Sequence, residues 1–115
     1  MPRSRSPCTG TALAAARRSG DPRALALAFE GLAGAGSVVA GSAERAAAAA
    51  LLGTAAALRE FLGTPLPPAE RHDVDRATVR LRARLGEDAF AAAFAHGRTL
   101  SPQAQAAALI EHAGP

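Results

Sequence analysis

The stretch GSAERAAAAALLGTAAALREFL, residues 41–62, decides the fold of this chain. It is rich in alanine, the residue with the highest helix propensity, and it predicts one helix of about six turns. Ser42 is a suitable N-cap, and Glu44 lies in the first turn, where the helix dipole favours negative charge. Gly63 ends the helix. An apolar helix of this length needs partners on its flanks, so the segments before and after it are expected to pack against it.

The predicted helix has one continuous apolar face, which we expect to be buried. It comprises Ala47, Leu51, Thr54, Leu58, Phe61 and Leu62. Four residues, Arg45, Ala48, Leu52 and Arg59, lie away from that face. Leu52 therefore indicates a second contact or a partner surface.

Composition favours one all-α domain. The chain has 115 residues, nearly half of them hydrophobic, but much of that share is alanine and only four residues are aromatic. Valine and isoleucine are few, which argues against a sheet. The net charge of +3 does not by itself imply nucleic acid. The single cysteine, Cys8, excludes an internal disulfide, no apolar run approaches the roughly 20 residues needed to cross a bilayer, and a cytoplasmic location is expected.

Capping and breaking signals divide the chain into six helices and no strands. Residues 1–9 are expected to form a disordered leader, and residues 10–113 a single helical-repeat domain. Asp21 and Pro22 predict a helix start, the segment TPLPP (residues 64–68) a stiff connector, and Gly86 a break. The predicted helices span about residues 11–19, 22–40, 42–62, 68–85, 87–96 and 102–112. Because the connections are short, neighbouring helices are expected to pack antiparallel.

The two helices around Gly41 carry small residues at matched distances from the turn. Gly34 precedes Gly41 by seven residues and Ala46 follows it by five. Small side chains there would allow a tight crossing, and the pattern resembles the helical hairpin of tetratricopeptide repeats. We therefore expect antiparallel hairpins stacked as an α-solenoid.

A longer resemblance covers about residues 11–113. The segments GDPRALALAFEGLAG, ERAAAAALLGTAAALREFLGTPLPPAER and LRARLGEDAFAAAFAHGRTLS resemble the C-terminal end of large bacterial ATP-dependent transcriptional regulators of the STAND class. Those regulators combine an NTPase core, a LuxR-type or SARP-type DNA-binding domain and a helical-repeat sensor. The most specific pieces are residues 51–53, 57–59, 65–68 and 85–87 with Phe90, Phe94 and Gly97.

The resemblance implies a sensor or interaction module without catalysis of its own. This chain lacks the GxxxxGK[ST] phosphate-binding loop and any recognisable DNA-binding helix pair. It is therefore expected to be the C-terminal segment, or a stand-alone remnant, of such a regulator.

The groove beside residues 22–40 and 42–62 is the predicted partner-binding site. Its candidate contacts are Leu27, Arg45, Leu52 and Arg59. A solenoid of few repeats has exposed end faces, because about three or more repeats are needed for stability. We therefore expect residues 11–19 to leave an apolar edge that a protein partner or a second copy covers.

An alternative function rests on a basic stripe. Arg76, Arg80 and Arg84 share one face of the helix predicted over residues 68–85 and could contact phosphates in a small DNA-associated regulator. The competing interpretation is a solvated helix face with Asp73 as a local ion-pair partner. Direct DNA binding is the less favoured of the two.

No pattern of residues predicts catalysis, a metal or a cofactor. His72, His96 and His112 fall on different predicted helices and match no metal-ligand spacing. No serine lies in a GxSxG context. Phe90 and Phe94 are four residues apart, so they are expected to stack in the core, against Leu85 and Leu100. An enzyme is therefore the least expected class of protein.

Overall fold

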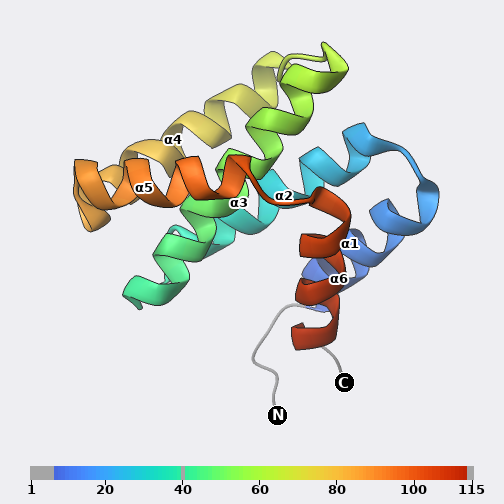
Figure 1. Cartoon of the computed structure of the whole chain (residues 1–115), viewed down its shortest axis with the longest axis horizontal. Helices are drawn as coiled ribbons and strands as arrows, with labels where there is room; N and C mark the ends of the chain where they lie inside the picture. Colours follow the sequence, from blue (N-terminus) through green and yellow to red (C-terminus); the bar gives the residue numbers. More distant parts are fainter. Residues whose placement is uncertain (1–6, 40, 114–115) are drawn as a thin grey trace.

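Six α-helices make up the fold of the residues that the structure describes (Figure 1). The computed structural model describes residues 7–39 and 41–113, and these contain no strand, so the all-α prediction is confirmed. None of the helices in these ranges has both the length and the apolar character needed to cross a bilayer. The helices are α1 (Pro7–Ser19), α2 (Pro22–Gly36), α3 (Ser42–Leu62), α4 (Pro68–Leu85), α5 (Glu87–Arg98) and α6 (Pro102–Ala113).

Local chemistry sets the helix ends. The Asp21 carboxylate caps α2 by accepting a hydrogen bond from a backbone N–H of the first turn at 3.0 Å. Gly63 follows α3 with a φ of 68°, a conformation that favours glycine. The N–H groups of Gly63 and Thr64 then donate to the carbonyls of Glu60 and Arg59 at 3.2 and 3.1 Å. This Schellman motif satisfies carbonyls that the helix end would otherwise leave unpaired.

Two predicted boundaries were wrong. α2 ends at Gly36 rather than near residue 40, because the Ser37 hydroxyl donates to the carbonyl of Gly34 at 2.7 Å and the chain turns. α1 begins at Pro7, so residues 7–9 are helical rather than part of a disordered leader. Residues 1–6 of that predicted leader lie outside the described residues.

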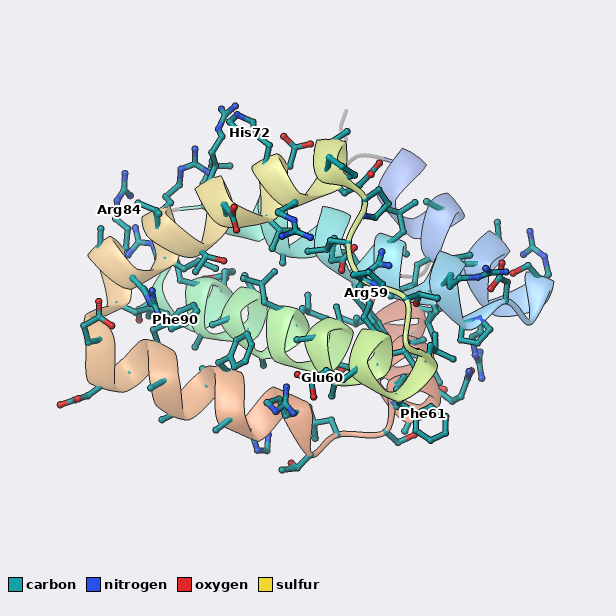
Figure 2. All side chains as sticks on the ribbon, turned by 90° about the horizontal axis from the view of Figure 1, so that it is seen from above. Arg59, Glu60, Phe61, His72, Arg84 and Phe90 are labelled. Atoms are coloured by element: carbon teal, nitrogen blue, oxygen red, sulfur yellow. The ribbon has the colours of Figure 1, made fainter. Side chains whose placement is uncertain are left out.

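Helix α3 occupies the centre of the molecule. Figure 2 shows α5 on one side of it and α2 with α4 on the other, and α3 also contacts α6. The middle of α3, residues 48–55, is consequently buried all round. The expectation that Leu52 faces outward was therefore wrong, and its side chain is only 3% exposed.

At the two ends of α3, residues that were predicted to be buried are exposed. Ala47 is exposed, and Phe61, which was expected in the core, is 87% exposed. Figure 2 shows Phe61 on the last turn of α3, pointing away from the other helices. A single-face pattern fails here because neighbours surround the middle of α3 but do not cover its ends.

Helices α3 and α5 approach each other backbone to backbone. Gly53 faces the carbonyl of Phe94, and Gly97 faces the carbonyl of Ala50, so a Cβ at either glycine would overlap the opposing oxygen. The buried Thr54 hydroxyl fixes the register by donating to the carbonyl of Gly97 at 2.7 Å. Glycine is needed at both positions because only a residue without a side chain permits this separation.

The predicted crossing of Gly34 with Ala46 was wrong. A Cβ built on Gly34 would meet no atom within 4 Å, whereas one on Gly36 would lie 3.0 Å from the Cβ of Ala48. The close approach of α2 to α3 therefore falls two residues later on each helix.

The first and last helices pack together. α1 contacts α2 and α6 (Figure 1). Leu13 on α1 and Ala106 on α6 are both buried. The prediction that α1 leaves an apolar edge open was wrong, because α6 covers it. Contact between α1 and α6 also departs from a linear stack of repeats, in which each repeat contacts only its neighbours.

Candidate ligand-binding cavity

A cavity of about 440 Å³ lies between α2, α3, α4 and α5. Leu66 of the connector before α4 also contributes to its lining. Its walls are mainly apolar, with charged side chains at a few places. The lining residues are Glu30, Leu52, Ala56, Arg59, Leu66, Val74, Thr78, Arg82, Glu87, Phe90, Ala91 and Phe94.

Two phenylalanines from α5 form one wall of the cavity. Phe90 and Phe94 lie one helical turn apart, with ring centroids separated by 5.8 Å and ring planes tilted by 30°. Their predicted stacking is confirmed, and Phe90 is buried. Leu52 and Val74 supply apolar surface from α3 and α4. This composition suits the apolar body of a small molecule.

A buried ion pair joins α2 to α3 at another part of the lining. Glu30 and Arg59 form two parallel hydrogen bonds, Nε to Oε2 at 2.6 Å and Nη2 to Oε1 at 2.9 Å. Their side chains are only 6% and 10% exposed. Hydrogen bonding to the Glu30 carboxylate raises the pKa of Arg59 above its usual value, so the guanidinium stays charged despite burial.

Arg59 has a third partner, which links the pair to the connector after α3. Its Nη1 donates to the carbonyl of Thr64 at 3.3 Å. Arg59 thus holds α2, α3 and the start of the proline-rich connector in one arrangement. The Glu30 carboxylate balances its charge, and all three of its nitrogens donate hydrogen bonds within the protein.

A second pair of charges has a looser geometry. Arg82 of α4 and Glu87 of α5 approach to 3.5 Å between Nε and Oε1, and their side chains are 52% and 77% exposed. The Arg82 guanidinium carbon also lies 5.2 Å from the centroid of the Phe90 ring, a cation–π arrangement. Arg82 is therefore positioned by an aromatic face of the cavity while it remains accessible to solvent.

The four predicted partner contacts do not form one surface. Leu52 and Arg59 both line the cavity, and both side chains are almost fully buried. Leu27 is half exposed and lies, with Arg59 and Pro65, in a second depression that Leu52 does not line. Arg45 lies at the start of α3, where its Nε donates to the carbonyl of Val39 at 3.1 Å.

The sequence interpretation missed Glu30, Arg82 and Glu87. A signal for Glu30 was present: it shares a helical stripe with Ala26 and Ala33, both of which are fully buried. An acid on an apolar stripe indicates a buried carboxylate that needs a cationic partner. No comparable signal marks Arg82 and Glu87, because they meet only through the packing of α4 against α5.

The three arginines of the basic stripe on α4 have different surroundings in the structure. Arg80 donates from Nη1 to the buried Ser37 hydroxyl at 2.9 Å, which ties α4 to the end of α2. Arg76 and Arg84 are exposed. Figure 2 shows Arg84 and His72 at opposite ends of α4. The three arginines therefore do not present equivalent free guanidinium groups.

Side chains able to bind metals do not gather among the described residues, where no three His, Cys, Asp or Glu groups could hold an ion together. His72 and His96 are exposed on α4 and α5 respectively. No protein-family model, curated protein or solved structure matches the chain.

Proposed function

We propose that this chain is a non-catalytic helical binding module whose site is the cavity between α2, α3, α4 and α5. The observation that supports it most is the combination of volume and lining: about 440 Å³ of mainly apolar space with a few charged groups. Binding sites for small molecules typically enclose about 300–1,000 Å³ and share this composition. The role is effector sensing, in which a ligand alters how α4 packs over the other helices.

The regulatory setting is the second part of the proposal. The resemblance to the sensor region of STAND-class transcriptional regulators supports it, as does a helical architecture without strands in the described residues. A tetratricopeptide-type origin of the α2–α3 hairpin belongs to the same proposal. Protein partners or a second copy would then bind exposed apolar residues such as Val38, Val39 and Val79.

A dye-binding experiment tests the cavity. N-phenyl-1-naphthylamine is neutral and apolar, and its fluorescence rises in apolar surroundings, so it should bind the folded protein. Ala56→Phe and Ala91→Phe place a ring into the cavity from α3 and α5 and should each abolish the signal. Ala92→Phe adds the same ring to an exposed position of α5 that does not line the cavity.

The comparison between the variants decides the result. Loss of dye binding in Ala56→Phe and Ala91→Phe, with binding retained in Ala92→Phe, supports the cavity as the site. Equal binding by all four proteins, each checked for helicity by circular dichroism, would refute it.

A further inference from the structure

We infer that the ligand of this cavity is a small apolar molecule with a single anionic group, such as a medium-length monocarboxylate, and that Arg82 binds the anion. This inference rests on the proposed function and extends it to a ligand class. It follows from the different states of the four charged side chains in the lining. Two of them neutralise each other completely, and two do not.

The Glu30–Arg59 pair is unavailable to a ligand. The carboxylate accepts two hydrogen bonds from one guanidinium, at 2.6 and 2.9 Å, and the third nitrogen of Arg59 donates to the carbonyl of Thr64. A ligand charge that displaced either partner would leave the other buried and unpaired, which is strongly unfavourable. This part of the lining therefore behaves as a neutral, closed wall.

Arg82 differs in having donors to spare. Its contact with Glu87 is long, at 3.5 Å, and involves Nε alone. Among the described residues, neither of its terminal nitrogens makes a hydrogen bond. Two parallel donors on a planar guanidinium match the two oxygens of a carboxylate. Glu87 is the more exposed member of the pair and can turn into solvent when an anion replaces it.

The apolar wall continues directly from Arg82. Its guanidinium lies over the ring of Phe90, and Phe90 is followed by Phe94 and faced by Leu52. A molecule whose anion binds Arg82 would thus place its apolar body along these side chains. A cationic side chain next to an apolar surface of limited size is complementary to a short alkyl or aryl carboxylate.

Competition between two matched compounds tests this inference. Octanoate and 1-octanol have the same chain length but differ in charge, and each is titrated against bound N-phenyl-1-naphthylamine. We expect octanoate to displace the dye at concentrations about tenfold lower than octanol, the difference that one hydrogen-bonded charge pair typically supplies. Arg82→Gln should remove this preference, measured as the ratio of the octanoate and octanol concentrations that displace half of the bound dye.

Two further variants sharpen the test. Arg84→Gln removes an exposed arginine from the same helix, away from the cavity, and should leave the preference for octanoate intact. Glu87→Gln removes the competing carboxylate and should strengthen octanoate binding roughly threefold. The gain should appear as an increase in the ratio of octanoate affinity to octanol affinity.

Different results would refute the anionic ligand class and the cavity as a binding site. If the dye binds and octanoate shows no advantage over octanol, or Arg82→Gln retains that advantage, the anionic ligand class is refuted while the cavity stands. If the dye does not bind to the cavity at all, the proposed function fails first.

Discussion

At the scale of single residues, the buried Glu30–Arg59 pair places two charges in the interior of the molecule. Both side chains are almost fully buried, and burial of a charge is unfavourable unless the charge is paired and hydrogen-bonded. Two short parallel hydrogen bonds provide that compensation. The pair joins α2 to α3, and its removal from one side only would leave an uncompensated charge in the cavity wall.

We predict that Glu30→Gln lowers the free energy of unfolding by about 3–5 kcal/mol, because Arg59 remains buried without its counter-ion. Urea denaturation followed by circular dichroism measures the change. The double variant Glu30→Met with Arg59→Met should recover most of the loss, because both charges are then gone. A loss in Glu30→Gln no larger than that in Glu60→Gln, an exposed pair, would contradict the prediction.

The Glu60–Arg98 pair provides a prediction for pH. Hydrogen bonding and attraction to Arg98 lower the pKa of Glu60 below its usual value of 4.5. A carboxyl group with a lowered pKa in the folded state stabilises the fold above the unfolded pKa, and this contribution is lost as the pH falls through the folded pKa. The advantage of the wild type over Glu60→Gln should therefore be present at neutral pH, begin to decline near pH 4.5 and be lost as the pH falls through the lower pKa of folded Glu60.

Melting temperatures of both proteins between pH 3 and pH 7 test this dependence. The pair is exposed on α3 and α5, so added salt should reduce the difference at neutral pH. A difference between the two proteins that stays constant through this pH range would show that Glu60 acts through packing rather than charge.

At the scale of helices, the contact between α3 and α5 depends on two glycines and one hydroxyl. Gly53 and Gly97 each face a carbonyl of the opposite helix, and Thr54 donates across the contact. The hydrogen bond is possible only because the two backbones lie so close. Separation of the helices would therefore leave the buried Thr54 hydroxyl with only the carbonyl of Ala50, which lies 3.2 Å away in its own helix.

We predict that Gly53→Ala and Gly97→Ala each destabilise the fold by about 1–3 kcal/mol or more, because the new methyl group forces the backbones apart. Gly31→Ala is the matched control: it lies inside α2, and no atom is within 4 Å of the new Cβ. There the higher helix propensity of alanine should stabilise the protein by up to about 1 kcal/mol. Thermal unfolding of the three variants checks both signs, and destabilisation by Gly31→Ala equal to that at Gly97 would contradict the argument.

Helix existence was predictable from the sequence because its signals are local. The Asp21–Pro22 start, Gly63 and Gly86 each act within one or two turns, and they placed the helices within a few residues. The partner of each helix is decided by distant residues, so the sequence pattern placed the α2–α3 crossing at Gly34 instead of Gly36 and did not indicate the closer α3–α5 contact at Gly53 and Gly97. The cavity was missed for the same reason: Leu52 could be recognised as apolar, but its neighbours on α4 and α5 could not.

At the scale of the whole molecule, the contact between α1 and α6 joins the first helix to the last. α6 contacts α1 and, to a smaller extent, α3, whereas the cavity is built from α2, α3, α4 and α5. The molecule therefore has a central four-helix assembly and a terminal pair, α1 and α6, of which α1 also packs extensively on α2. Regions with fewer buried contacts open at lower free energy than the core.

We predict that Ala106→Asp detaches α6 and loosens α1 while the four cavity helices stay folded. Ala106 is fully buried, so an aspartate there places a charge without a partner between α6 and its neighbours. Hydrogen exchange should show that the amides of α1 and α6 lose protection while those of α3 keep it, and binding of N-phenyl-1-naphthylamine should persist. Ala108→Asp, at an exposed position of the same helix, should change neither measurement. Loss of protection in all six helices by Ala106→Asp would instead show that the terminal pair and the cavity unfold as one cooperative unit, and the ligand site would then depend on residues far from its lining.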